Sequence, residues 1–214
     1  MFRSTFSLAG TVVLAFALFF GAINAQGQEY SLTIEATAAV TEGLTTYRFY
    51  VDMNDATDRM SAVFGNNEYA LEFNAPEGAF NSAFNASWNA SGINPAFLGA
   101  FPDLADDTYA TVGLDGPASA SGISGAADPA VVEDAGQPIT PFFLTNGATS
   151  LLSNTLTGAS WYILNTASNG LPDGDMRVLI MQVTTSGALT GTMHAQVFPP
   201  VSYTHLTLPT KRIV

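Results

Sequence analysis

The chain contains no cysteine. It therefore cannot form a disulfide, use a thiol nucleophile, or hold zinc or an iron–sulfur cluster through thiolates. Exported domains often rely on disulfides, so this one must be stabilised by its hydrophobic core. The region from Gln26 to Pro200 is long enough for one such domain, because a chain of that length buries roughly 70% of the surface that its unfolded form exposes.

Positive charge is almost absent from the same region. Residues 26–200 contain no lysine, three arginines and all eighteen acidic residues, which gives a net charge of −15. Nucleic acids and anionic membranes are bound through lysine and arginine, so we expect neither as a partner. Two origins account equally well for this composition: a salt-adapted protein, or a protein that is simply acidic.

Residues 1–25 have the pattern of a secretory signal peptide. Arg3 supplies the positive start, residues 6–20 are uncharged and mostly apolar, and Ala25 stands at the cleavage position. The apolar run is too short for a good membrane anchor, which is the alternative interpretation. We expect the mature chain to begin at Gln26, to be secreted or displayed at the cell surface, and to carry no membrane span.

Residues 201–214 differ in composition from the region before them and contain Lys211, the first lysine of the chain. Positions 201–210 read VSYTHLTLPT, which resembles one reading frame of a translated sequencing adapter. This resemblance implies that the tail is an artefact and that the natural C-terminus is missing. The predicted organisation is a signal peptide (1–25), one domain (26–200) and an artefactual tail (201–214).

Hydrophobic periodicity within the domain predicts β-strands. Three stretches alternate with period two, as strands with one wet face do: residues 29–37, 45–53 and 108–114. Residues 160–164 and 177–184 are nearly continuous apolar runs, typical of central strands covered on both faces. A short turn containing glycine connects the second run to residues 189–197, which predicts a hairpin.

Helix signals are sparse, and two long irregular stretches, residues 80–102 and 117–141, separate the predicted strands. Structureless loops of that length are uncommon in compact domains unless they are functional or packed by their own side chains. Short strands joined by turns rich in glycine and proline are typical of sandwiches. The predicted fold is therefore all-β, a single-domain β-sandwich with long irregular loops and little helix.

Three segments resemble a recurrent module of secreted proteins from marine Bacteroidetes and planctomycetes. They read GLTTYRFYVDM followed by DRMSAVFGN, then WNASGINPAFLGAFPDLADDTYATVGLDGP, then GASWYILNTASNGLPDGDMRVLIMQVTTSGALTGTMHAQVFP. The resemblance covers nearly all of residues 30–199 and implies export and surface display. It brings no catalytic residues with it.

One acidic cluster is a candidate calcium site. It consists of Asp52, Asn54, Asp55 and Asp58, at the end of a predicted strand. Calcium takes six to eight oxygen ligands from carboxylates, amides and carbonyls, but an EF-hand frame starting at Asp52 fails, since its sixth and twelfth residues are Thr57 and Val63. The alternative is that these are solvated turn residues, where aspartate is favoured by side-chain-to-backbone hydrogen bonds.

The segment 80–101 is a candidate carbohydrate-binding site because asparagines alternate there with aromatic residues. The proposed ligand-binding residues are Asn85, Trp88, Asn89 and Asn94. A flat aromatic face flanked by amides suits a sugar of an extracellular polysaccharide. The alternative is a packed loop whose aromatics are core and whose asparagines satisfy local turns.

No catalytic residue is assigned. His194 is the only histidine in residues 26–200, and its strand pattern predicts a solvent-facing side chain. Neither a G-x-S-x-G elbow nor a phosphate-binding loop occurs. The leading hypothesis is a secreted or cell-surface module that is not an enzyme and needs no cofactor. The alternatives are a carbohydrate-binding module and a glycoside hydrolase that uses two carboxylates.

Overall fold

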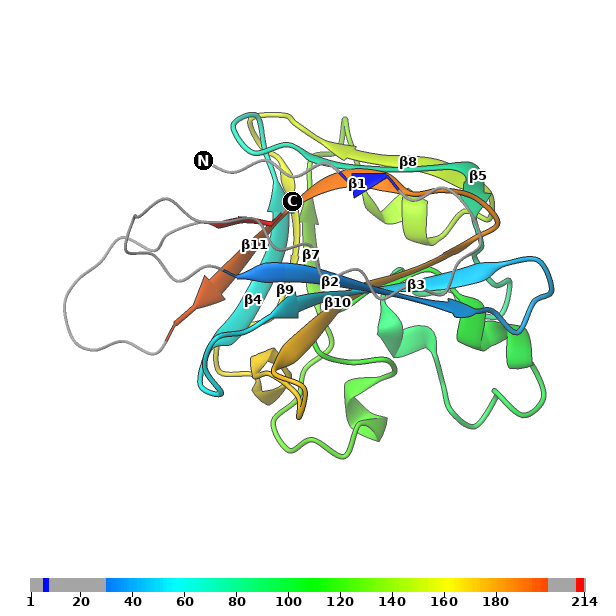
Figure 1. Cartoon of the computed structure of the whole chain (residues 1–214), viewed down its shortest axis with the longest axis horizontal. Helices are drawn as coiled ribbons and strands as arrows, with labels where there is room; N and C mark the ends of the chain where they lie inside the picture. The colour runs from blue at the N-terminus through cyan, green and yellow to red at the C-terminus, as the bar shows by residue number, and fades with distance from the viewer. Residues whose placement is uncertain (1–5, 8–29, 200–210, 214) are drawn as a thin grey trace.

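The computed structural model describes residues 6–7, 30–199 and 211–213, which form two antiparallel sheets packed on each other (Figure 1). The predicted all-β sandwich is confirmed. The strands are β1 (Phe6–Ser7), β2 (Ser31–Ala38), β3 (Thr45–Asp52), β4 (Arg59–Gly65), β5 (Leu71–Ala79), β6 (Tyr109–Ala110), β7 (Ala130–Glu133), β8 (Ala148–Ser153), β9 (Ala159–Tyr162), β10 (Arg177–Thr185), β11 (Thr190–Phe198) and β12 (Lys211–Ile213).

Helical structure in the described part of the chain is limited to short 3-10 turns. These are η1 (Ala90–Gly92), η2 (Pro102–Asp106), η3 (Ala118–Ala120), η4 (Thr140–Phe143) and η5 (Ser168–Gly170). None of these turns is long and apolar enough to cross a membrane. The predicted signal peptide and the adapter-like tail lie outside the described residues, apart from β1 and β12.

The smaller sheet has the strand order β2-β3-β10-β6. β3 pairs with β2 along its whole length and with β10 on its other side. Every residue of β10 after Arg177 is buried, as its continuous apolar sequence predicts. β10 is therefore an inner strand of this sheet, paired with β3 and β6. The predicted hairpin is wrong, because β11, which follows β10 after a short turn, lies in the second sheet.

In the larger sheet, β4 and β5 form one interrupted strand beside β11. β4 pairs with the C-terminal half of β11 and β5 with its N-terminal half, both antiparallel. Residues 66–70 loop out between them, and the chain returns so closely that a Cβ at Gly65 would collide with Leu71. On the far side, β9 pairs with β4 and β8 pairs with β5, so β8 and β9 also lie end to end. A side chain at position 65 would therefore occupy the place where the strand resumes at Leu71.

Trp161 of β9 connects the two sheets. Its side chain is fully buried, and its indole N–H donates to the carbonyl oxygens of Thr111 (3.1 Å) and Ile180 (3.2 Å) on the facing sheet. The ring also meets Phe143 edge to face, with the ring centroids 5.8 Å apart. One side chain therefore combines core packing with the hydrogen bonding of two buried carbonyls.

Two other strand predictions require correction. Residues 160–164 are not covered on both faces: β9 alternates between buried and half-buried residues, and Leu164 is 69% exposed. β9 lies one position from the edge strand β7, so its outer face is only partly covered. The predicted strand 108–114 shortens to β6, because the chain turns away at Gly113, where φ is +69°.

Trp161→Phe should lower the free energy of unfolding by about 1–3 kcal/mol, because it keeps most of the packing but removes the indole donor from the buried Thr111 carbonyl, whereas the Ile180 carbonyl still accepts the Thr111 backbone N–H. Trp161→Ala should cost more, about 3–5 kcal/mol, because it also opens a cavity. Urea unfolding followed by circular dichroism measures both. Equal stability of the wild type and Trp161→Phe would show that the indole N–H does not contribute as described.

Candidate functional site

The segment 80–107, which we call the aromatic loop, is fixed to the sandwich by a buried carboxylate. Asp107 is 1% exposed and accepts hydrogen bonds from the Ser82 backbone N–H and the Asn85 side-chain amide, both at 2.6 Å. Burial raises the pKa of Asp107 to about 7, although the hydrogen bonds from Asn85 and Ser82 act in the opposite direction. The start of the loop is thereby held against its end.

A second carboxylate attaches the neighbouring turn to the same place. Asp106 is 2% exposed, and its two oxygens accept the backbone N–H groups of Val40 (2.8 Å) and Thr41 (2.7 Å). These residues belong to the turn between β2 and β3. The turn and the aromatic loop therefore form one anchored surface.

Three of the four predicted sugar-binding residues are used inside the fold. Asn85 bonds to Asp107, and Asn89 is 5% exposed and donates to the carbonyl of Pro129 at 3.1 Å. Trp88 is partly buried and packs against the main core. Of the predicted set, Asn94 lies exposed at the surface. The packed-loop alternative thus describes Asn85, Trp88 and Asn89.

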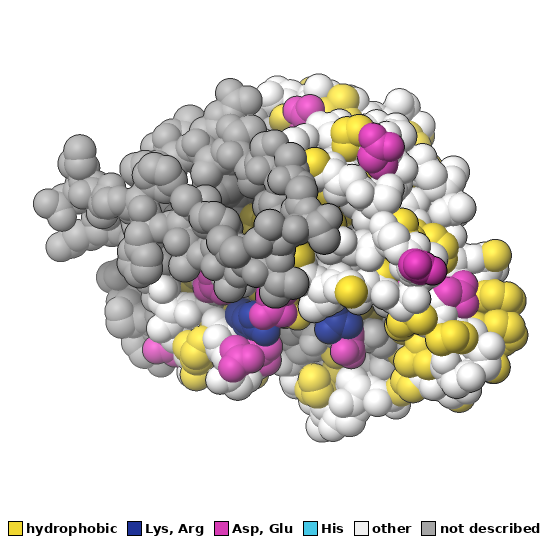
Figure 2. Space-filling view, turned by 45° about the vertical axis from the view of Figure 1, so that its right-hand side comes forward, with side chains coloured by type: hydrophobic (Ala, Val, Ile, Leu, Met, Phe, Trp, Pro, Cys, Tyr) yellow, Lys and Arg dark blue, Asp and Glu magenta, His cyan; other side chains and the backbone are white. Residues whose placement is uncertain are grey.

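The exposed aromatic side chains of the loop are phenylalanines that sequence reasoning did not select. Phe84 and Phe97 are 55% and 52% exposed, and Phe84 stacks on Phe101 with the ring centroids 4.0 Å apart. Val40, on the attached turn, is 60% exposed. Figure 2 shows hydrophobic side chains gathered at the lower right of the view, to the right of the arginines. We call Val40, Phe84, Phe97 and Phe101 the aromatic surface.

The predicted calcium ligands are directed into local hydrogen bonds. Asp58 is 0% exposed, and its Oδ2 accepts the backbone N–H groups of Asn54 (3.0 Å) and Asp55 (2.9 Å), so it closes its own turn. Burial, followed by the neighbouring Asp58, raises the pKa of the Tyr30 phenol. Asp58 is therefore part of the interior of the fold.

The other two acids of the cluster point elsewhere. Asp52 accepts from the hydroxyls of Ser31 (2.7 Å) and Thr33 (2.9 Å) across the sheet, whereas Asp55 accepts from Thr57 within the turn. Among the described residues, no group of three or more His, Cys, Asp or Glu side chains converges as metal ligands would. The turn-acid alternative accounts for the observed contacts.

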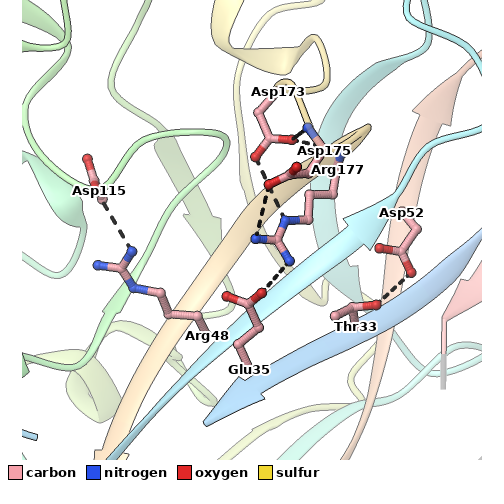
Figure 3. Close-up of polar contacts among 8 residues, drawn as sticks. All are labelled: Thr33, Glu35, Arg48, Asp52, Asp115, Asp173, Asp175 and Arg177. Atoms are coloured by element: carbon pink, nitrogen blue, oxygen red, sulfur yellow. Dashed lines mark hydrogen bonds and ion pairs between the residues drawn. The ribbon is translucent and has the colours of Figure 1, made fainter. Parts of the chain in front are cut away.

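The outer face of the smaller sheet carries two arginines held by the chain's own acids (Figure 3). Arg177 pairs with Glu35, Asp173 and Asp175, and its guanidinium lies 4.0 Å from the centroid of the Tyr50 ring. Three carboxylates and an aromatic face surround one cation. This arrangement leaves no excess positive charge for an acidic ligand.

Arg48 is satisfied in a similar way. Its Nε donates to the Gln182 side-chain oxygen at 2.9 Å, and its guanidinium lies 4.0 Å from Asp115. Two small pockets flank the loop of residues 113–123, with volumes of about 190 and 250 Å³. Both are below the roughly 300–1,000 Å³ of typical small-molecule sites. Neither of these two pockets therefore has the volume of a typical small-molecule site.

The prediction for His194 is wrong, since its side chain is 1% exposed. It packs against the rings of Phe64 and Tyr69, with centroids 5.9 and 5.5 Å away. Tyr69 belongs to the excursion of residues 66–70 that interrupts the long strand, and this excursion folds back over the outer face of β11. The alternation of polar and apolar residues in β11 gives no sign of this excursion, so it could not predict the burial of His194.

No protein-family model, curated protein or solved structure matches this chain. The class of protein is therefore that of the fold, an all-β sandwich, and the function must be argued from its surfaces.

The buried Asp107 should make the stability of the fold depend on pH. Its pKa is about 7 in the folded chain against about 3.9 when unfolded, so the folded state holds the proton more tightly. The stabilisation that protonated Asp107 gives the folded state is fully present below about pH 4 and is lost as the pH rises through 7. In Asp107→Asn this loss, on the order of a few kcal/mol, should be absent.

Urea unfolding of the wild type and Asp107→Asn between pH 4 and 8 measures the effect. Asp134→Asn is the control, because Asp134 forms a hydrogen bond to Thr155 at the surface, and its pKa is lowered. The control should keep the wild-type pH dependence over this range. Parallel stability curves for the wild type and Asp107→Asn would contradict the desolvation of Asp107.

Proposed function

We propose that the domain is an exported, non-catalytic binding module whose aromatic surface contacts a neutral polysaccharide. The observation that carries the proposal is the exposure of Phe84 and Phe97 on an otherwise anchored loop. Large apolar side chains on a fixed loop are costly to leave in water, and loops on a rigid scaffold commonly carry binding functions.

The charge of the domain supports a neutral ligand. Residues 26–200 carry eighteen acids and three arginines, and two of those arginines are paired with acids of the chain. An acidic polysaccharide, a nucleic acid or an anionic membrane would be repelled. A neutral sugar presents apolar C–H faces to aromatic rings and hydroxyls to polar neighbours such as the exposed Asn94.

The environments of the acids support a non-catalytic role. A glycoside hydrolase needs a general acid with a raised pKa within reach of the substrate. Asp107 has a raised pKa but is buried beneath the aromatic loop and bonded to Ser82 and Asn85. Glu35, Asp173 and Asp175 are paired with Arg177.

Phe84→Ala and Phe97→Ala should each weaken retention on a neutral polysaccharide by about tenfold, since stacking of a ring on an aromatic face contributes roughly 0.5–1.5 kcal/mol beyond buried area. Affinity electrophoresis of the mature chain in gels containing neutral glucans, mannans or chitin derivatives measures this retention. Gels containing alginate or pectin test the expected exclusion of acidic polymers.

Leu156→Ala is the matched control, because Leu156 is 86% exposed but lies outside the aromatic surface. It should be retained like the wild type. The proposal fails if no neutral polysaccharide retards the wild-type chain, or if the phenylalanine variants and Leu156→Ala lose retention equally.

A further inference from the structure

A small pocket of about 190 Å³ lies between the aromatic loop and the segment 115–121. We call it the loop pocket. A site that holds one residue of a polymer can be smaller than a site that encloses a whole drug-sized ligand. The residues that line the loop pocket include Ile93, Pro95 and Leu98 of the aromatic loop and Asp115, Gly116 and Ser121 of the segment.

The loop pocket and the aromatic surface share one compact turn of the chain. The carbonyl of Phe97 accepts the backbone N–H groups of Ala100 (3.0 Å) and Phe101 (2.8 Å), which folds this part of the loop back on itself. Leu98 and Phe101 pack against the same small buried cluster. Leu98 lines the pocket and directly follows the exposed Phe97, so the pocket adjoins the aromatic surface.

Hydrogen bonds of the chain hold the opposite wall of the loop pocket. The backbone N–H of Ala118 donates to Asp128 at 2.8 Å, and the Ser121 hydroxyl donates to the carbonyl of Ala118 at 2.8 Å. The two walls come close at Gly116, where a Cβ would lie 3.3 Å from the carbonyl oxygen of Ile93. The pocket is therefore formed before any ligand arrives, which lowers the ordering cost of binding.

Asp115 brings hydrogen-bond acceptors to the loop pocket. Its side chain is 72% exposed, and its ion pair with Arg48 is 4.0 Å long. Figure 3 shows Asp115 beside Arg48 and apart from the acids that pair with Arg177. Unlike the buried Asp107, this carboxylate accepts no hydrogen bond from the described residues. Both of its oxygens are therefore available to donors of a ligand.

We propose that the loop pocket holds one sugar residue of the neutral polysaccharide that contacts the aromatic surface, and that Asp115 accepts hydrogen bonds from two adjacent hydroxyls of that residue. This inference rests on the proposed function and adds the side chain that selects the sugar. Ile93 and Leu98 offer apolar contact to the C–H face of the sugar ring. An apolar wall with a few polar groups directed at the ligand is typical of binding sites.

The chemistry of the carboxylate predicts which linkage is preferred. Its two oxygens accept two donors side by side. A 1,4-linked hexose residue keeps adjacent hydroxyls at carbons 2 and 3, whereas a 1,3-linked residue uses the oxygen at carbon 3 for the linkage and keeps no adjacent pair on its ring. The loop pocket should therefore favour 1,4-linked polymers.

Asp115→Ala tests this preference by affinity electrophoresis in gels that contain a 1,4-linked glucomannan or a 1,3-linked glucan. The wild type should be retained at least about fivefold more strongly by the glucomannan, because hydrogen bonds to a charged oxygen add to its affinity. Asp115→Ala should lose that preference and keep wild-type retention in the 1,3-linked glucan. Asp115→Asn, which keeps one acceptor oxygen, should show an intermediate preference.

Glu68→Ala is the matched control, because Glu68 is an exposed acid outside the loop pocket. It removes the same charge, so it corrects for the changed mobility, and it should behave like the wild type in both gels. Phe97→Ala should weaken retention in both gels, because the aromatic surface contacts either polymer. Circular dichroism checks that each variant folds.

The inference is overturned if Asp115→Ala keeps the wild-type preference or loses retention equally in both gels. A wild-type chain that is retained through Phe97 but shows no preference for the 1,4-linked polymer overturns it too, and leaves the proposed function standing. If no neutral polysaccharide retards the wild type, both fail. Selective loss of the glucomannan preference in Asp115→Ala, with Glu68→Ala unchanged, supports it.

Discussion

The structure depends on buried polar side chains that hold long loops in a chain without disulfides. Asp106 and Asp107 attach the β2–β3 turn and the aromatic loop, and Asp58 closes the turn before β4. Asn169, 2% exposed, uses its amide to join the carbonyls of Val112 and Ala127. Each of these contacts gives a backbone group of a loop or turn a hydrogen-bond partner on a buried side chain. The loops are thereby ordered by hydrogen bonds rather than by covalent links.

This constraint explains the division between interior and surface. Amides and carboxylates that look like ligand groups in the sequence form hydrogen bonds within the fold, as Asn85 and Asn89 do. What remains outside on the aromatic loop is a set of phenylalanine rings. Arg48 and Arg177 are likewise paired with neighbouring acids. A neutral ligand with apolar faces fits that surface best.

Much of the fold could be predicted because strand patterning is local. The alternation of residues 45–53 and the apolar run of 177–184 correspond to β3 and β10. β4 and β5 could not be recognised, because they are two halves of one strand with an excursion between them, and β5 contains Pro76 and Gly78. Tyr69 of the excursion also packs against His194, which is why this side chain is buried instead of solvent-facing as predicted.

The candidate site was less predictable because its partners are distant in sequence. The segment was selected because it carries many amides and aromatics, but it is attached to the rest of the fold by contacts such as that between Asp106 and Val40, 66 residues apart. Trp88 packs against the main core, whereas Phe84, four residues earlier, is exposed. Composition indicates that such a loop must be anchored, and only the tertiary structure decides which side chains perform the anchoring.

Hydrogen–deuterium exchange of the mature chain tests most directly whether the buried side chains order the loops. The amides of Val40, Thr41 and Ser82 donate to Asp106 and Asp107, although none lies within a strand. They should exchange at least about a hundredfold more slowly than unprotected amides, because exchange requires breaking their hydrogen bonds to buried carboxylates. Exchange of all three at the rate of an unstructured chain, while β10 remains protected, would contradict the account.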